Sequence, residues 1–225
     1  MCDRYTHLFT WHQLADLYKL TSSGGAPANF EPNHYVAPGQ KAPVVRIRDG
    51  QRELVMLHWG LIPHWAKNVK IGCKTKYGLD KTSVPGPAYR TAWRTRRCLI
   101  PASGYYEWSQ VPGRKQKQSY LIAFRDRRPF SLAGLWESST DPMNDEVLDS
   151  YTILTGPPNE VVAEVKSRMP VIIDPADHMR WLTATEPPTD LLRPHSAAEM
   201  TAYEISTEVK VASRAKASPS PRRAS

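Results

Sequence analysis

Cys2 directly follows the initiator methionine, and removal of Met1 would give this cysteine a free α-amine beside its thiol. An N-terminal amine titrates at about pH 8, well below a lysine amine, so part of it is neutral and nucleophilic at cytosolic pH. The amine can add to an aldehyde and lose water to give an imine. The neighbouring thiolate can then attack the imine carbon and close a five-membered thiazolidine ring. A processed chain could therefore capture aldehydes covalently.

The ring-opened sugar of an abasic site in DNA exposes such an aldehyde at C1′. Cys2 alone does not select this substrate, because a cysteine at position 2 is usually incidental. The net charge of +8 gives limited help, since five of the positive charges lie at 210–225, where there is no acidic residue. The remaining +3 permits contacts to nucleic-acid phosphates without requiring them. A soluble protein with a basic tail explains the charge equally well.

The cysteine pattern and the apolar runs indicate the compartment. The three cysteines at 2, 73 and 98 form neither a metal-ligand spacing nor a disulfide framework. No apolar run has the length of a membrane-spanning helix, and the first residues lack the pattern of a secretory signal. We expect a cytoplasmic monomer, associated with the nucleoid if bacterial, that uses no membrane, metal or cofactor. No glycine-rich phosphate loop or dinucleotide motif is present.

Local patterns predict many short strands and a few short helices. Asp49-Gly50 suits a tight turn between strands at 44–48 and 53–58, and Thr10 can cap a helix that ends near Leu20. We expect residues 21–43 to form a loop and residues 68–88 to be irregular. Further strands are predicted within 97–109 and at 119–124, 130–136, 150–154, 169–173 and 203–205, with 119–124 and 130–136 paired as a hairpin. Further helical segments are predicted at 92–97, at 159–166 and from Pro175.

These elements predict an α+β fold, a single domain built on a curved, mainly antiparallel and barrel-like β-sheet with a few short helices. We expect the domain to cover residues 2–209 and a disordered basic tail to cover 210–225. No internal repeat and no second domain is indicated.

A series of short motifs runs along the chain in a specific order. The series is MCDRY (1–5), YVAPGQ (35–40), WGLIPHW (59–65), PAYR (87–90), RCLIPASGYYEW (97–108), AGLWE (133–137), TILT (152–155) and SRMPVII (167–173). It resembles the SOS-response-associated peptidase family, also called abasic-site processing proteins, from Cys2 to about residue 209. The resemblance implies loss of Met1 by self-removal and binding of single-stranded or junction DNA in a basic groove. It also implies a thiazolidine between Cys2 and the abasic sugar, which shields the lesion from strand cleavage.

The resemblance implies roles for individual residues. Glu107 falls at the family's catalytic glutamate, which exchanges protons with the α-amine or the sugar ring oxygen. Its apolar neighbours should raise its pKa, although a solvated glutamate at a strand end is the plain alternative. The positions that face DNA or line the pocket match Arg4, Pro38, Trp65, Arg90, Thr155 and Arg168.

Each of these residues has an open alternative. The three arginines could be ordinary surface residues, and Thr155 could instead cap the helix that follows it. Pro38 would be a rigid loop element beside Cys2. Trp65 could wedge against a base, whereas Trp59 is expected in the core.

The chain departs from the family pattern at two catalytic positions. Tyr77 stands where the family has an asparagine that contacts the sugar, and Lys166 stands where it has a histidine that acts as general acid and aids reversal. Leu79, Lys81 and Lys210 are further replacements. A lysine can still donate a proton or, if its pKa is lowered, form an imine itself.

Three functions follow from this pattern. The leading one is a DNA-repair enzyme that crosslinks Cys2 to abasic single-stranded DNA, with reversal impaired by the loss of the histidine. The alternative is a catalytically degenerate protein that binds single-stranded DNA. A thiol peptidase acting beyond Met1 is disfavoured, because Cys2 lacks a recognisable histidine partner.

Overall fold

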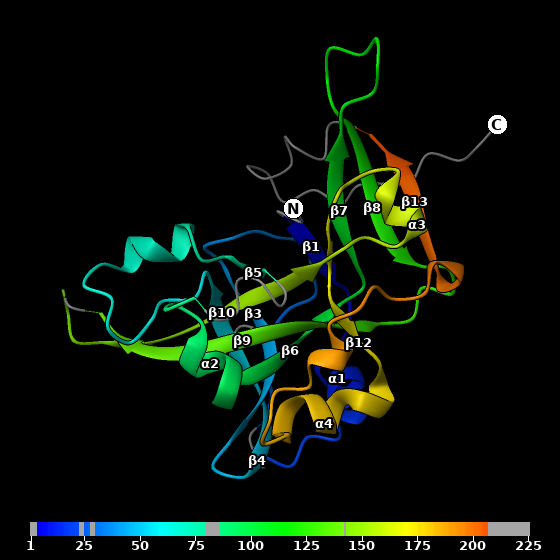
Figure 1. The fold of residues 1–225 in the computed structure, drawn as a ribbon. Helices are drawn as coiled ribbons and strands as arrows, with labels where there is room; N and C mark the ends of the chain where they lie inside the picture. The colour runs from blue at the N-terminus through cyan, green and yellow to red at the C-terminus, as the bar shows by residue number, and fades with distance from the viewer. Residues whose placement is uncertain (1–3, 23–24, 28–29, 80–85, 142, 207–225) are drawn as a thin grey trace.

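The computed structural model describes residues 4–22, 25–27, 30–79, 86–141 and 143–206 (Figure 1). The strands are β1 (Arg4–His7), β2 (Asn33–Val36), β3 (Lys41–Arg48), β4 (Gln51–Trp59), β5 (Tyr77–Leu79), β6 (Arg97–Ala102), β7 (Gly104–Ser109), β8 (Gln118–Phe124), β9 (Phe130–Thr140), β10 (Val147–Gly156), β11 (Met169–Pro170), β12 (Ile172–Ile173) and β13 (Met200–Ile205). The α-helices are α1 (Trp11–Tyr18), α2 (Arg90–Thr95), α3 (Glu160–Ala163) and α4 (His178–Thr183). The 3-10 helices are η1 (Val69–Cys73), η2 (Pro175–Asp177), η3 (Thr189–Leu191) and η4 (Ala197–Glu199).

Five strands of the larger sheet close into a barrel in the order β10-β4-β3-β6-β9 and back to β10. The β10–β4 pair is parallel, and the other pairs around the barrel are antiparallel. A second, antiparallel sheet has the order β13-β8-β7-β1-β2. The predicted α+β fold on a curved, mainly antiparallel sheet with a few short helices is therefore confirmed. None of the helices in the described part of the chain is long and apolar enough to cross a membrane.

The core is shared by the two sheets, because Tyr5 and Tyr105 of the second sheet pack in one cluster with Trp59 and Tyr151 of the barrel. Close approach of the barrel strands depends on Gly134. A Cβ atom there would lie 2.3 Å from the Ile100 side chain and 2.7 Å from the Thr152 carbonyl oxygen. We therefore expect any larger residue at position 134 to push β9 away from its neighbours.

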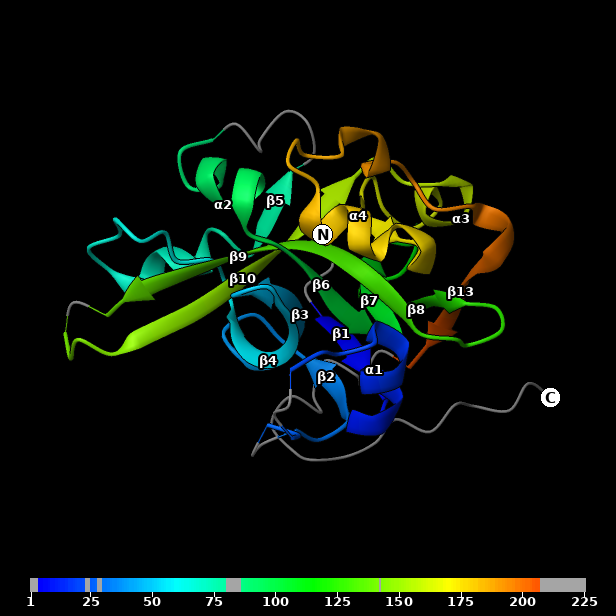
Figure 2. The ribbon, with the colours of Figure 1, turned by 90° about the horizontal axis from the view of Figure 1, so that it is seen from below.

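A second apolar cluster joins the barrel to α1, α2 and α4, and α4 packs on β6 (Figure 2). Arg97 of β6 holds two of these helices against the barrel through hydrogen bonds from its buried guanidinium group. It donates to the carbonyl oxygens of Trp181 and Ala184 at the end of α4 and to those of Trp93 and Arg94 in α2. Carbonyls at the end of a helix lack partners within the helix, and a cation there satisfies them.

The elements predicted from local signals are confirmed. Thr10 caps α1 by accepting from the Gln13 backbone N–H, and the Gln13 side chain accepts from the Thr10 N–H in return. Asp49 and Gly50 both have positive φ angles, of 51° and 74°, as a tight turn between β3 and β4 requires. Both features depend on residues that are adjacent in the sequence.

Several predictions that needed long-range information are wrong. Residues 119–124 and 130–136 do form strands, but β8 belongs to the second sheet and β9 to the barrel, so they are not a hairpin. The segment 169–173 is split into β11 and β12, because the two pair with different strands, β10 and β9. The expected loop at 21–43 contains β2 and the start of β3, and the irregular 68–88 contains η1 and β5.

Two buried histidines should make the fold sensitive to acid. His7 is 2% exposed and His178 is 7% exposed, and burial lowers the pKa of each to about 4. In the unfolded chain a histidine titrates at about pH 6.5. Between pH 6.5 and 4 the unfolded state therefore binds protons that the folded state excludes. The free energy of unfolding should fall by about 3 kcal/mol per histidine as the pH is lowered through this window.

Urea unfolding followed between pH 7 and 4 measures this loss. The variant His178→Phe keeps a ring stacked on Tyr18, which lies 5.2 Å from the histidine ring, and removes the titrating group. We expect a shallower pH dependence for this variant, while replacement of the exposed His34 with glutamine should leave the wild-type slope. An unchanged slope in both His178→Phe and His7→Phe would contradict the prediction.

Candidate active site

Glu107 lies on β7 with its side chain turned into the protein. It pairs with Tyr120 of β8, and the preceding Tyr106 pairs with Arg4 of β1. Because side chains alternate along a strand, Glu107 shares a face with Tyr105, which packs in the core. Glu107 is 0% exposed. The alternative of a solvated surface glutamate is therefore wrong.

Lys166 meets this buried carboxylate. Its Nζ lies 3.6 Å from Glu107 Oε2, and the lysine side chain is 30% exposed. A buried carboxylate is costly unless a nearby positive charge compensates it, and Lys166 supplies that charge from the solvent side. The pair therefore combines a group that can accept a proton with an accessible group that can donate one.

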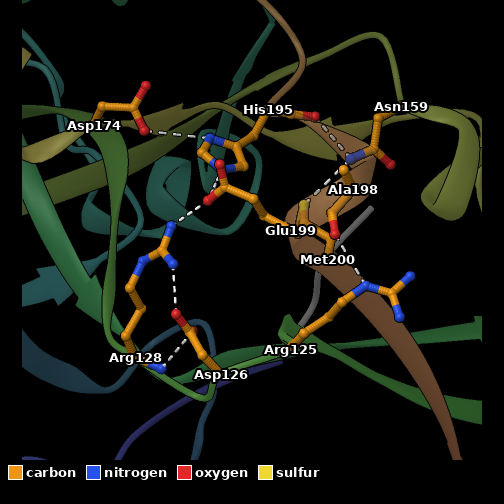
Figure 3. Close-up of polar contacts among 9 residues, drawn as sticks. All are labelled: Arg125, Asp126, Arg128, Asn159, Asp174, His195, Ala198, Glu199 and Met200. Atoms are coloured by element: carbon orange, nitrogen blue, oxygen red, sulfur yellow. Dashed lines mark hydrogen bonds and ion pairs between the residues drawn. The ribbon is translucent and has the colours of Figure 1, made fainter.

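The segment that carries Lys166 is held by Asn159, the N-cap of α3. The Asn159 Oδ1 atom accepts from the Val162 N–H at 2.9 Å, and the Val162 carbonyl accepts from the Lys166 N–H at 2.7 Å. On its other side, Asn159 Nδ2 donates to the His195 carbonyl oxygen at 2.9 Å (Figure 3). Asn159 thus links the backbone of Lys166 to a separate part of the fold.

His195 is the centre of a polar network next to this link. Its Nδ1 lies 3.4 Å from Asp174 Oδ1, and its Nε2 lies 3.4 Å from Glu199 Oε2 (Figure 3). Arg128 forms an ion pair with Glu199 as well. Sequence reasoning missed both Asn159 and His195. Asn159 could have been found as a capping residue after Pro157-Pro158, whereas nothing local marks His195.

Arg168 and Thr155 meet where β11 pairs with β10. Arg168 Nε donates to Thr155 Oγ1 at 3.3 Å, and its guanidinium group also donates to the Thr155 carbonyl oxygen. The buried Thr155 hydroxyl in turn donates to the Gly78 carbonyl oxygen at 3.4 Å. Because Asn159 caps α3, the interpretation of Thr155 as a helix cap is wrong.

The start of β1 lies beside the strand that carries Glu107. Arg4 pairs with Tyr106, and its guanidinium carbon lies 5.2 Å from the centre of the Tyr35 ring, on the sheet face opposite Glu107. Pro38 follows two residues after Val36, which pairs with Tyr5. Cys2 itself lies outside the described residues.

The family model described as SOS response associated peptidase (SRAP) matches residues 1–212. The chain belongs to the SRAP family. Abasic site processing protein YoqW of Bacillus subtilis is 33% identical over 214 residues, covering 93% of this chain and 94% of the relative. Abasic site processing protein HMCES of Gallus gallus is 29% identical and covers 80% of this chain and 63% of the relative.

Solved structures share the SRAP fold seen here. A protein from Bacteroides thetaiotaomicron superimposes with a TM-score of 0.83 at 23% identity, covering 93% of this chain and 94% of its own. A protein from Bordetella bronchiseptica gives a TM-score of 0.75 at 25% identity, covering 91% of this chain and all of its own.

Tyr77 is buried in the core. Its ring lies edge-on to Trp59 with 6.0 Å between ring centres, and its carbonyl oxygen accepts from the Tyr89 hydroxyl at 2.9 Å. The burial of Trp59 confirms its predicted place in the core. A role of Tyr77 toward the sugar stays a prediction. Lys81 and Lys210, two of the further replacements, lie outside the described residues.

Trp65 stands on an anchored loop of the SRAP domain and is 50% exposed. The Ile62 N–H donates to Ser150 Oγ at 2.8 Å, and His64 Nδ1 lies 3.6 Å from Glu137 Oε2. An exposed indole on a fixed loop is suited to stacking on a base, which stays a prediction.

Arg90 is exposed at the start of α2. Within the described ranges, no three His, Cys, Asp or Glu side chains are grouped to hold a metal ion.

Proposed function

We propose that this SRAP protein processes abasic sites in single-stranded DNA by forming a covalent thiazolidine between Cys2 and the abasic sugar. The relatives named as abasic site processing proteins support the substrate. The observation that carries the chemistry is the contact between Glu107 and Lys166, next to the start of β1. Cys2 stands two residues before Arg4 in the chain, and Arg4 pairs with Tyr106, the neighbour of Glu107 on β7.

The reaction begins with loss of Met1, which we propose the protein performs on itself. Glu107 then takes a proton from the α-ammonium group, and the neutral amine adds to C1′ of the ring-opened sugar. The carbinolamine loses one water to give the imine, and the thiolate of Cys2 adds to the imine carbon. The nitrogen takes up a proton, so the net change is one aldehyde condensed with loss of one water. The ring shields the sugar from strand cleavage.

Lys166 serves in this scheme as the proton donor to the departing oxygen. A lysine amine ordinarily titrates near pH 10.4 and an imidazole near pH 6.5. An ammonium group can still donate a proton to the departing oxygen, but it is a weaker acid than an imidazolium and exchanges its proton less readily at neutral pH. We propose that crosslinking is retained and that its reversal is slow.

A competing proposal is a degenerate protein that only binds single-stranded DNA, favoured by the core position of Tyr77. Intact-mass measurement separates the two after incubation with three matched oligonucleotides. One contains an abasic site, one contains the tetrahydrofuran analogue that has no aldehyde, and one is undamaged. We expect an adduct with the abasic strand only, at the summed mass of Met1-free protein and DNA minus one water.

The same adduct reports reversal when it is mixed with excess of a second abasic oligonucleotide of different length. We expect little transfer to the second strand over hours for the wild type and faster transfer for Lys166→His. Equal noncovalent binding to all three oligonucleotides with no adduct would favour the degenerate protein instead.

A further inference from the structure

The connection between β7 and β8, residues 110–117, projects beyond both sheets (Figure 1). We call it the basic loop, because its sequence QVPGRKQK contains Arg114, Lys115 and Lys117 and no acidic residue. All three positive side chains are exposed. Neither lysine forms an ion pair with any residue in the part of the chain that the structure describes. The loop thus concentrates positive charge at one extremity of the molecule.

The basic loop is braced rather than loosely tethered. The Arg114 N–H donates to the Val111 carbonyl oxygen at 3.1 Å, and Gly113 has a φ angle of 80°, which together form a tight turn at Pro112-Gly113. Gln110 Nε2 donates to the Arg114 carbonyl oxygen at 2.7 Å. Arg114 Nη1 donates to Gln118 Oε1 at 2.6 Å.

Gln118 connects this brace to the sheet, because its Nε2 also donates to the Ile205 carbonyl oxygen of β13 at 2.9 Å. A pre-ordered loop loses less conformational entropy when it binds a ligand. The bracing leaves Lys115 and Lys117 as the groups available for a partner.

The strand that leads into the basic loop is the strand that carries Glu107. A strand rises about 3.3 Å per residue, so the loop begins about 10 Å beyond Glu107 and its turn lies about 20 Å away. One strand of stacked DNA advances about 3.4 Å per nucleotide. The loop is therefore about three to six nucleotides from an abasic sugar held at Glu107.

Another projecting turn has the opposite charge. The turn between β9 and β10 contains Asp141, Asp145 and Glu146 and projects from a different side of the molecule (Figure 1). A polyanion that passes the Glu107 site would be repelled from that turn and attracted to the basic loop. The contrast between these two turns favours the basic loop over the acidic turn as a contact for the flanking DNA.

We propose that the basic loop is a second DNA-contacting element, which binds backbone phosphates about three to six nucleotides from the abasic site. The inference rests on the proposed function, since Glu107 marks where the lesion is held. Its ligand is the phosphate backbone, and the flank that supplies it can be single-stranded or duplex. The loop would add affinity and orient the protein on the strand without reading base sequence.

The test compares Lys115→Gln/Lys117→Gln with Arg125→Gln/Arg127→Gln. The second pair removes two exposed positive charges from the turn at the other end of β8, so both variants have the same net charge. Binding is measured against salt concentration on tetrahydrofuran-containing oligonucleotides, which separate affinity from covalent chemistry. The set comprises a five-nucleotide strand with the analogue at its centre, a 21-nucleotide strand and strands with a duplex flank on either side.

On the longer DNAs we expect the salt dependence of log K to lose about 1.4 in slope for the loop variant where the contacted flank is single-stranded and about 1.8 where it is duplex, with the control variant like the wild type. All proteins should bind the five-nucleotide strand equally. The oligonucleotides on which the loop variant loses affinity show on which side of the lesion the loop contacts the DNA. Equal slopes for the loop variant and the wild type, or an equal loss in the control variant, would overturn the inference.

Crosslinking to a short abasic strand keeps this outcome separate from the proposed function. If the loop variant crosslinks that strand like the wild type but loses affinity for longer DNA, both proposals stand. If no protein crosslinks it, the covalent function fails, while the binding comparison still decides whether the loop contacts DNA.

Discussion

Replacement of Cys2 with alanine is expected to abolish the stable adduct with abasic DNA. The alanine variant keeps an N-terminal amine of similar basicity, so it can still form an imine with the sugar aldehyde. It has no thiolate to close the ring, and an imine hydrolyses in water. The adduct should therefore vanish from denaturing gels and intact-mass spectra unless borohydride is added to reduce the imine.

Two other cysteines make the comparison specific to position 2. Cys73 is exposed, so Cys73→Ala is the matched control and should crosslink like the wild type. Cys98 is fully buried, and burial raises the pKa of its thiol, which leaves it unreactive. An adduct of Cys2→Ala that survives heating without borohydride would show that the ring is not the crosslink.

The sequence could predict those parts of the fold that depend on neighbouring residues. The capping box at Thr10 and the turn at Asp49-Gly50 are local, and both are present. The partners of the strands could not be predicted from neighbouring residues, because equally apolar runs at β8 and β9 enter different sheets. The positively charged linker 125–128 fits a hairpin turn and a crossing between sheets equally well.

The candidate site likewise combines features that the sequence predicts with features that depend on long-range contacts. Motif matches selected Glu107 and Lys166, and the structure brings their side chains within 3.6 Å across 59 residues of chain. Neither residue type reveals that the carboxylate is fully buried, since burial depends on how β7 pairs with β1 and β8. The link from Asn159 to His195 joins segments 36 residues apart and could not be read from spacing.

Substitution of Glu107 with glutamine is expected to slow crosslinking by about 10²- to 10⁴-fold, the usual contribution of a positioned acid–base group. Glutamine keeps the size and the polar oxygen but cannot take a proton from the α-ammonium group. It also leaves Lys166 without its charge partner, and because that lysine is partly exposed, solvent can stabilise it. The fold should therefore survive while the rate falls. Single-turnover adduct formation between pH 5 and 9 measures the effect.

The control for Glu107→Gln is Glu53→Gln. Glu53 also forms a carboxylate–cation contact, 2.6 Å from Arg46 Nε, but it lies on β4 in the barrel wall. Loss of that ion pair should lower the free energy of unfolding without changing the crosslinking rate. A positioned base predicts that the rate of Glu107→Gln falls below that of Glu53→Gln across this pH range, while both variants keep the acid limb that protonation of the N-terminal amine imposes. If the rate of Glu107→Gln matched that of Glu53→Gln at every pH, the buried carboxylate would have only a structural role, and proton transfer would have to come from water or from Lys166.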